Sequence, residues 1–302
     1  MLYDIAIIGA GPAGMTAALY AVRAGKSVLL LEGEMYGGQI VQSSRVENYP
    51  GAPEINGAEL AMKMMEPLSE FGVGVTSETV TGLQKSEDGF SIVTNQSTHA
   101  ARAVVIATGV GHRKLDVPGE DRFIGRGISF CATCDGMFFR GKDVAVVGGG
   151  NTAVQDALVL SELCTRVFLI HRREGFRAEE RILERARKTQ NIEFVTDTVV
   201  REMLGEARVE SLMLSNVKTG DTRELPVAGV FLAVGNVARN EAFRGLIELD
   251  KDGYIVTDAD CATSQAGIFA AGDCRQKKIR QLTTATADGT IAALSAVEYL
   301  DG

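Results

Sequence analysis

The residues that decide the fold are YDIAIIGAGPAGMTAALYAVRAGKSVLLLEG, residues 3–33. The apolar run at 3–8 alternates little with polar residues, which is typical of a parallel strand buried on both faces. It enters the pattern G-x-G-x-x-G at 9–14; a helix follows, and a second apolar strand ends at Glu32, 23 residues after the first glycine. Between a strand and a helix, and followed by a second strand that ends in an acid, this motif predicts a dinucleotide-binding site. The glycine backbone and the N-terminus of the helix would bind the pyrophosphate, and the carboxylate would bind the ribose.

The same plan returns at residues 142–177. A strand leads into GGGNTA at 148–153, and counting 23 residues from the first of these glycines reaches His171. A basic cluster replaces the acid there: His171, Arg172, Arg173 and Arg177. Because guanidinium groups match a ribose 2′-phosphate that a carboxylate would repel, we expect FAD at the first site and NADPH, in preference to NADH, at the second. A solvated run of positive charge is the alternative explanation.

The second copy of the plan is inserted into the first. The segment GIFAAGD at 267–273 and a helical tail are left over after the second copy and complete the first. We therefore predict an α/β protein with two Rossmann-like dinucleotide-binding domains of the three-layer ββα type. The FAD-binding domain comprises 1–113 and 242–302, and the NADPH-binding domain is 114–241.

Composition narrows the functional class. The chain has 302 residues, 45% of them apolar and 23% charged, which suits a globular protein of about two domains. A net charge of -8 argues against nucleic acid as the main partner. No apolar run approaches the ~20 residues of a membrane helix, and the N-terminus has no signal-peptide pattern. With only five cysteines, we expect a cytoplasmic protein without a membrane partner.

Two of the cysteines, Cys131 and Cys134, are separated by two residues and precede the second glycine loop. A structural zinc site would need a second such pair, and Cys164, Cys261 and Cys274 offer none, so we expect no metal. A pair buried as small apolar residues is the plainer alternative. Beside two dinucleotide sites, however, the spacing favours a redox-active dithiol, because a flavin can accept a hydride from NADPH and pass electrons to sulfur.

Asp135 directly follows the pair and is a candidate acid. It would protonate a departing thiolate if a poorly solvated site raised its pKa. An ordinary loop or capping aspartate beside Gly136 is the alternative.

With these motifs the chain resembles the bacterial low-molecular-weight thioredoxin reductases along essentially its whole length. The shared motifs, in the family's order, are GAGPAG, GGQI, ENYPG, ATG, VPGE, CATCDG, GGGNTAV, HRREGFRAE and GIFAAGD. Several occur in other flavin disulfide reductases, whereas CATCDG followed closely by GGGNTAV and HRR is specific to this family and its near relatives. The resemblance implies a homodimer that passes electrons from NADPH through FAD and the Cys131–Cys134 disulfide to thioredoxin or a thioredoxin-like protein.

The resemblance also implies roles for individual residues. The FAD site would comprise Gly9, Gly11, Gly14, Glu32, Gly38, Gln39, Asn48, Gly272, Asp273, Arg280 and Gln281. The NADPH site would comprise Gly148, Gly150, Asn151, Thr152 and Ala153 at the pyrophosphate, with His171, Arg172, Arg173 and Arg177 at the 2′-phosphate. Cys134 would face the flavin, Cys131 would attack the partner's disulfide, and Asp135 would be the acid.

Both the dithiol and the nicotinamide would have to reach one flavin, so the resemblance implies rotation of the inserted domain. We expect the hinges at Lys114–Gly119 and Val237–Glu241. Two departures from the family occur where it commonly has proline: GNVARN follows LAVG, and Ala266 precedes GIFAAGD.

Three rival functions stay open at this point. The reductase of a peroxiredoxin system has the same machinery but normally carries an additional N-terminal thioredoxin-like region. Ferredoxin-dependent relatives usually lose the basic cluster. A nucleotide-sensing flavoprotein would keep both glycine loops but would not need the cysteine pair.

Overall fold

The computed structural model describes residues 1–43, 46–52 and 55–302, and the chain divides into two compact units. Unit 1 comprises Met1–Gly111 and Val237–Gly302, and unit 2 comprises His112–Asn236. Each unit contains a sheet with parallel strands and helices, so the predicted α/β class with Rossmann-like domains is confirmed.

Unit 1 is built on a seven-stranded sheet with the order β3-β2-β1-β6-β5-β4, in which β17 also pairs with β6. Its strands are β1 (Leu2–Ile8), β2 (Val28–Glu32), β3 (Val75–Ser77), β4 (Val80–Ser86), β5 (Gly89–Thr94), β6 (Thr98–Ile106) and β17 (Ile268–Ala270). The strands β3, β2, β1, β6 and β17 run parallel, whereas β4 and β5 form a hairpin beside β6.

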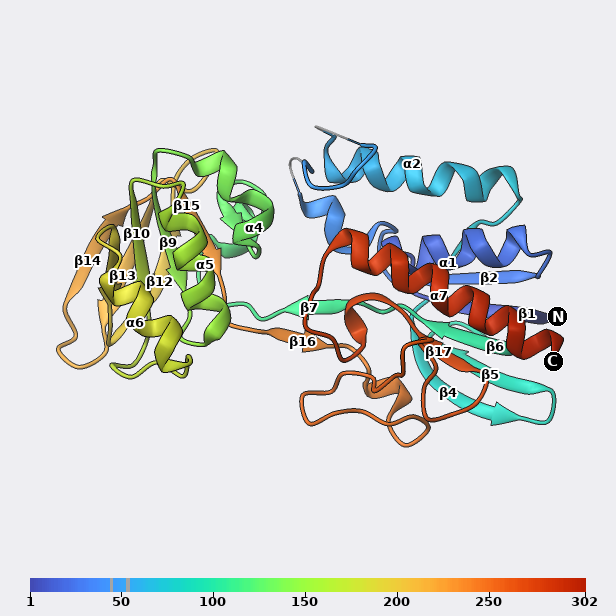
Figure 1. The fold of residues 1–302 in the computed structure, drawn as a ribbon. Helices are drawn as coiled ribbons and strands as arrows, with labels where there is room; N and C mark the ends of the chain where they lie inside the picture. The colour runs from blue at the N-terminus through green and yellow to red at the C-terminus, as the bar shows by residue number, and fades with distance from the viewer. Residues whose placement is uncertain (44–45, 53–54) are drawn as a thin grey trace. The chain divides into compact units, whose positions relative to one another are not determined.

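The helices of unit 1 are α1 (Pro12–Arg23), α2 (Gly57–Glu70) and α7 (Leu282–Asp301), and α1 and α7 lie side by side (Figure 1). Both helices contribute fully buried alanines to one apolar cluster, and a Cβ atom at Gly289 of α7 would lie only 2.3 Å from the carbonyl oxygen of Ala13 on α1. Small side chains let the two helices approach closely, and this helix pair completes the core over β1.

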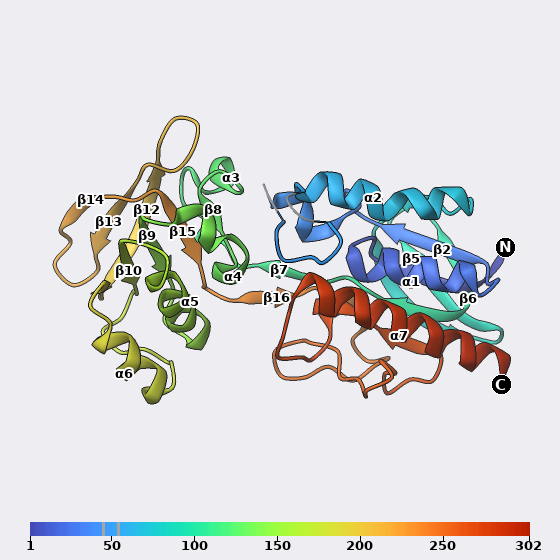
Figure 2. The same cartoon turned by 45° about the horizontal axis from the view of Figure 1, so that its top comes forward.

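Unit 2 contains a five-stranded parallel sheet with the order β11-β10-β9-β15-β8. Its strands are β8 (Ile128–Ser129), β9 (Asp143–Val147), β10 (Arg166–Ile170), β11 (Ile192–Val195) and β15 (Gly229–Leu232), and its longer helices are α5 (Asn151–Ser161) and α6 (Glu180–Lys188). A three-stranded antiparallel meander, β12 (Thr198–Leu204), β13 (Ser211–Asn216) and β14 (Thr222–Pro226), completes the unit (Figure 2).

Short elements carry several of the predicted site residues. They are η1 (Gly38–Gln42), α3 (Glu120–Phe123), α4 (Ala132–Asp135), η2 (Gly136–Phe139), η3 (Glu241–Phe243) and η4 (Gly272–Cys274). The chain crosses between the units in β7 (Val110–His112) and β16 (Asn236–Ala238), which pair as a two-stranded sheet.

These crossings precede the divisions expected after residues 113 and 241, and a buried polar side chain explains the second difference. Asn240 is 1% exposed; it donates to the carbonyls of Gly253 and Cys274 and accepts from the Thr108 hydroxyl, which holds it in unit 1. Glu120 is 2% exposed, and its carboxylate accepts from backbone N–H groups of the segment 115–117. The segments expected as hinges are therefore partly fastened within their units.

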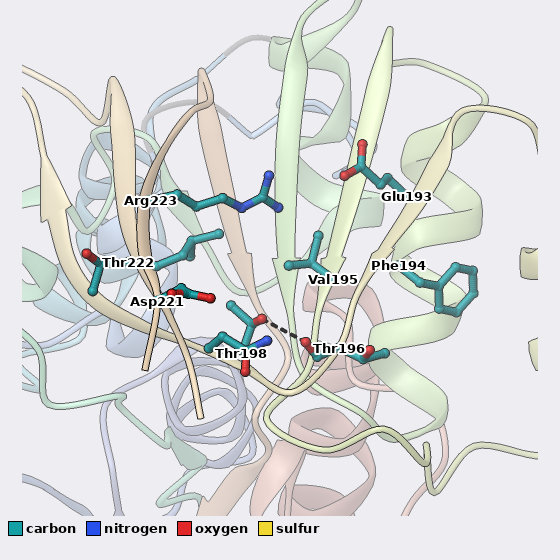
Figure 3. A pocket seen from close by; sticks show the side chains of 10 residues that line it. Glu193, Phe194, Val195, Thr196, Thr198, Asp221, Thr222 and Arg223 are labelled. Atoms are coloured by element: carbon teal, nitrogen blue, oxygen red, sulfur yellow. Dashed lines mark hydrogen bonds between the residues drawn. The ribbon is translucent and has the colours of Figure 1, made fainter. Parts of the chain in front are cut away.

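A pocket of about 370 Å³ in unit 2 lies between β11 and the meander, lined by residues such as Phe194, Thr198, Asn216 and Arg223 (Figure 3). None of the predicted site residues lines it. Among the residues that the structure describes, no helix has the length and apolar character to cross a membrane, and no cluster of three or more His, Cys, Asp or Glu is arranged to hold a metal ion.

Asp156 on α5 generates a prediction about stability. Burial raises the pKa of this carboxyl to about 7. The native state therefore holds a proton that the unfolded chain releases above its ordinary pKa of about 4, and the free energy of unfolding falls as the pH rises between these values. We expect Asp156→Asn to unfold like the wild type near pH 3, where the carboxyl is protonated in both states, and to be more stable by about 4 kcal/mol near pH 8.

Denaturant titrations at both pH values measure this difference. The matched control is Glu162→Gln, which changes an exposed carboxylate just beyond the same helix. An equal gain for Asp156→Asn at both pH values would contradict the prediction.

Candidate active site

The first glycine loop joins β1 to α1 and is shaped by close backbone contacts. Gly9 has a φ of +108°, and a Cβ atom there would lie 2.4 Å from the carbonyl oxygen of Ala107. A Cβ atom at Gly14 would lie 1.8 Å from the carbonyl oxygen of Gly9. At Gly11 a Cβ atom would meet only Gly38 Cα, at 3.9 Å. The loop thus leaves open backbone at the start of a helix, which fits a pyrophosphate.

The second loop, between β9 and α5, repeats this arrangement. A Cβ atom at Gly148 would lie 2.4 Å from the carbonyl oxygen of Ala233, whereas one at Gly150 would meet nothing within 4 Å. Asn151, Thr152 and Ala153 form the first turn of α5. Both loops therefore have a packed first glycine and an open middle glycine, and each fits the phosphates of one dinucleotide.

Glu32 lies at the end of β2, beside the first loop. Its Oε2 accepts from the backbone N–H of Ala10 and its Oε1 from that of Glu34, both at 2.9 Å. These bonds hold the carboxylate at the place where a ribose would be bound. Gly38 and Gln39 begin η1, and the Gln39 amide donates to the carbonyl of Val110.

Asp273 supports a cofactor site in unit 1. It lies in η4 after Gly272, and its Oδ1 is buried without a hydrogen-bond partner among the described residues. Burial also raises the pKa of this carboxyl. A buried polar atom without a partner is costly, so a hydroxyl-rich group such as the ribityl chain of FAD fits here.

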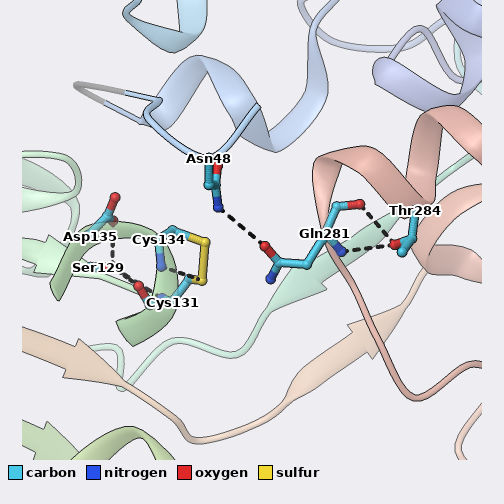
Figure 4. The surroundings of a disulfide bond; sticks show 7 residues. All are labelled: Asn48, Ser129, Cys131, Cys134, Asp135, Gln281 and Thr284. Carbon is cyan, nitrogen blue, oxygen red and sulfur yellow. Dashed lines mark hydrogen bonds between the residues drawn. A yellow bond between two sulfur atoms is a disulfide. The ribbon is translucent and has the colours of Figure 1, made fainter. Parts of the chain in front are cut away.

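The remaining predicted FAD residues lie around the start of α7. Arg280 donates from Nε to the Asp273 carbonyl at 3.4 Å, and Asn48 donates to the Gln281 side chain at 3.3 Å (Figure 4). Gln281 in turn caps α7 through a reciprocal pair of bonds with Thr284. The structure thus brings together residues that the sequence separates by more than 200 positions.

The basic loop of unit 2 separates His171 from the arginines. The His171 ring is 8% exposed and lies under Gly149, where an added Cβ atom would come within 2.2 Å of it. Burial and the neighbouring arginines lower the pKa of His171. The ring packs against the glycine loop, and its Nε2 is buried without a hydrogen-bond partner among the described residues, so the role of His171 at the 2′-phosphate stays a prediction.

The three arginines of this loop are free to bind an anion. Arg172, Arg173 and Arg177 are exposed, and none forms an ion pair within the described parts of the chain. The loop is fastened to the phosphate loop, since Arg177 N–H donates to Gly149 O and Glu179 N–H donates to the Asn151 side chain, both at 2.7 Å. Exposed guanidinium groups on a loop whose backbone is fastened beside a phosphate loop fit a 2′-phosphate.

Cys131 and Cys134 form a disulfide across the start of α4, with Cα atoms 5.3 Å apart. Ser129 lies beside it: its hydroxyl donates to Asp135 Oδ2 at 2.6 Å and accepts from Cys131 N–H at 3.1 Å (Figure 4). Burial raises the pKa of Asp135, and the Ser129 bond opposes that effect. The candidate acid is therefore in a poorly solvated place next to the disulfide, as its proposed role requires.

The other cysteines differ from this pair. Cys164, Cys261 and Cys274 are buried thiols, and burial raises the pKa of each to about 11. They are therefore protonated and poorly nucleophilic near neutral pH.

Sequence reasoning missed the residues that position the site. Ser129, Glu179 and Asn240 act through hydrogen bonds to other site or core residues. Ser129 gave a local signal, because it stands two residues before Cys131. The partners of Glu179 and Asn240 lie 13 to 132 positions away, and nothing local reveals them.

Comparison with known proteins gives full-length matches. The model of the pyridine nucleotide-disulphide oxidoreductase family matches residues 3–289. The thioredoxin reductase of Treponema pallidum is 46% identical, over 99% of this chain and 97% of its own, and that of Listeria innocua is 42% identical, over 99% and 94%. The crystal structure of the Streptococcus pyogenes thioredoxin reductase is 43% identical, over 99% of this chain and 98% of its own, with a TM-score of 0.95.

The free arginines predict a change in nucleotide preference. In Arg177→Ala we expect the KM for NADPH to rise about tenfold while the KM for NADH changes little, because a charge-assisted bond to the 2′-phosphate is lost. Steady-state kinetics with both nucleotides measure this. Arg185→Ala, on the exposed side of α6 and paired with Glu162, is the control. Equal losses with the two nucleotides would mean that Arg177 does not bind the 2′-phosphate.

Proposed function

The chain belongs to the pyridine nucleotide-disulphide oxidoreductase family and within it to the thioredoxin reductases, and we propose how its residues carry electrons from NADPH to thioredoxin. Enzymes of this type use FAD and NADPH, and the bound flavin supplies the link between a hydride donor and a disulfide. The observation that carries the proposal is the Cys131–Cys134 disulfide with Ser129 and Asp135 around it, in a chain with two dinucleotide loops.

We assign FAD to unit 1 and NADPH to unit 2. The open backbone at Gly11, the carboxylate of Glu32 and the unpartnered oxygen of Asp273 support the first assignment. The open backbone at Gly150 and the unpaired arginines support the second. The intact basic cluster argues for a nicotinamide donor over ferredoxin.

The chemistry at sulfur is a pair of two-electron steps. Two electrons and two protons break the Cys131–Cys134 bond and give two thiols. The Cys131 thiolate then attacks the disulfide of thioredoxin, which breaks that S–S bond and forms a mixed disulfide, and one sulfur of thioredoxin leaves as a thiolate. Cys134 attacks Cys131, releases the second sulfur of thioredoxin and restores the internal disulfide.

Asp135 has the environment of an acid for these steps. A raised pKa keeps part of the carboxyl population protonated at a higher pH than usual, and the proton can pass to a departing thiolate. Ser129 holds one carboxyl oxygen at 2.6 Å and so fixes its direction. Asp135 and Ser129 thus form one hydrogen-bonded group with the backbone of Cys131.

We further propose a homodimer in the cytoplasm, acting on thioredoxin or a thioredoxin-like protein. Apolar side chains exposed on α1 and α7, among them Tyr20, Ile291 and Leu294, would be covered by a second copy. Three cysteines kept as thiols suit a reducing compartment. Light scattering of the purified protein tests the oligomeric state.

An anaerobic NADPH titration tests the electron path. We expect the wild type to take up about four electrons per flavin, two by the flavin and two by the disulfide, and Cys134→Ser to take up about two. Flavin absorbance measures the uptake. Cys164→Ser, which changes a buried thiol outside the path, should keep the wild-type value. Uptake that stops at about two in the wild type would show that the disulfide is outside the path.

The raised pKa of Asp135 predicts the pH dependence. The acid is protonated below its pKa, so thioredoxin reduction that depends on it falls as the pH rises through that raised value. We expect Asp135→Asn to lower kcat by about 100-fold and to remove this fall. The kcat measured from acidic to alkaline pH checks it, with exposed Asp121→Asn as the control. A pH profile unchanged in Asp135→Asn would assign the proton to another group.

A further inference from the structure

His112 and Phe130 form a stacked ring pair in unit 2. Their ring centroids are 4.0 Å apart and their planes are inclined by only 4°. The Nδ1 atom of His112 lies 3.0 Å from Oδ1 of Asn236, which is an acceptor, so Nδ1 is the donor of this bond. The His112 ring is therefore held by a face contact on one partner and by a hydrogen bond to another.

The stacked pair joins the two ends of unit 2 to the disulfide loop. His112 is the last residue of β7 and Asn236 the first of β16, and they are the first and last residues of unit 2. Phe130 directly precedes Cys131 and packs against the unit's core. The stack therefore ties the two strands by which the chain enters and leaves unit 2 to the loop that carries the disulfide.

The disulfide loop has two side-chain anchors of different kinds. Ser129 holds one side through its bonds to Cys131 N–H and Asp135. Phe130, the next residue, holds the loop through its ring, one face of which His112 covers. Cys131 is the residue from which α4 starts, so a change in the Phe130 ring alters the backbone that directs both sulfur atoms.

We infer that His112 is a positioning residue for the reaction: by stacking on Phe130 it fixes the Cys131–Cys134 loop to the paired strands β7 and β16. It acts through Phe130. This inference rests on the electron path proposed above. It assigns a role to a residue that lies outside both nucleotide sites and outside the cysteine motif.

The test compares two activities of the holoenzyme. In His112→Ala we expect the kcat for NADPH-dependent thioredoxin reduction to fall about three- to tenfold, since an aromatic pair of this geometry is lost. The KM for thioredoxin should change little. NADPH oxidation by ferricyanide, which takes electrons from the reduced flavin without the dithiol, should stay at the wild-type rate.

Four further variants make the result specific. His112→Phe keeps a ring over Phe130 and should restore most of the kcat, and Phe130→Ala should reproduce the loss. The double variant His112→Ala with Phe130→Ala should be no worse than either single variant. His99→Ala is the control, because His99 lies in unit 1 and bonds to Glu78 there. A wild-type kcat in His112→Ala, additive losses in the double variant, or equal losses with ferricyanide would overturn the inference.

A second readout does not need thioredoxin. We expect the Cys131–Cys134 disulfide of His112→Ala to exchange with dithiothreitol about threefold faster than in the wild type, and His112→Phe to return the rate, because a loosened loop is more open to attack. An unchanged exchange rate would overturn the inference even if the wild type failed to reduce thioredoxin. That failure by itself would instead refute the proposed function.

Discussion

Both units depend on one backbone contact that leaves no room for a side chain. The first glycine of each loop, Gly9 and Gly148, lies so close to the carbonyl of a neighbouring strand end that a Cβ atom would be 2.4 Å from its oxygen. This contact brings the start of the following helix to the sheet edge, and the middle glycine is left with open space. The N-terminus of the helix can therefore face a pyrophosphate, and the strand, loop and helix are fixed together.

The two loops share this contact but differ in the charge beside it. In unit 1 the next strand ends in Glu32, whose two oxygens are held by backbone N–H groups. In unit 2 the next strand leads to three arginines without ionic partners among the described residues. Because a 2′-phosphate needs compensation of its charge and a plain ribose needs hydrogen-bond acceptors, the same frame serves two nucleotides through a change of a few side chains.

The sequence predicts those parts of the site that local chemistry determines. The glycine spacing, the buried strands and the Cys131–Cys134 pair are local patterns, and each can be recognised within a stretch of about 30 residues. The unit boundaries were less predictable, because Asn240 is held by Thr108 and Cys274, which lie 132 and 34 positions away. The packing of His171 is a related case, because its ring lies against Gly149, 22 positions earlier, where a side chain would collide with it.

The disulfide loop combines two requirements that oppose each other in a protein. A proton donor for sulfur needs a raised pKa and hence burial, whereas a disulfide that reacts with another protein needs access. The chain resolves this by placing Asp135 in a poorly solvated position fixed by Ser129, while both cysteines remain only partly buried. A loop that is half open must then be held by its neighbours, and Ser129 and Phe130 supply that support from adjacent positions. The order of residues in SFCATCD therefore serves to position the loop as well as to carry out redox chemistry. Ser129 anchors the acid, Phe130 anchors the loop to the crossing strands, and the reactive Cys131 follows.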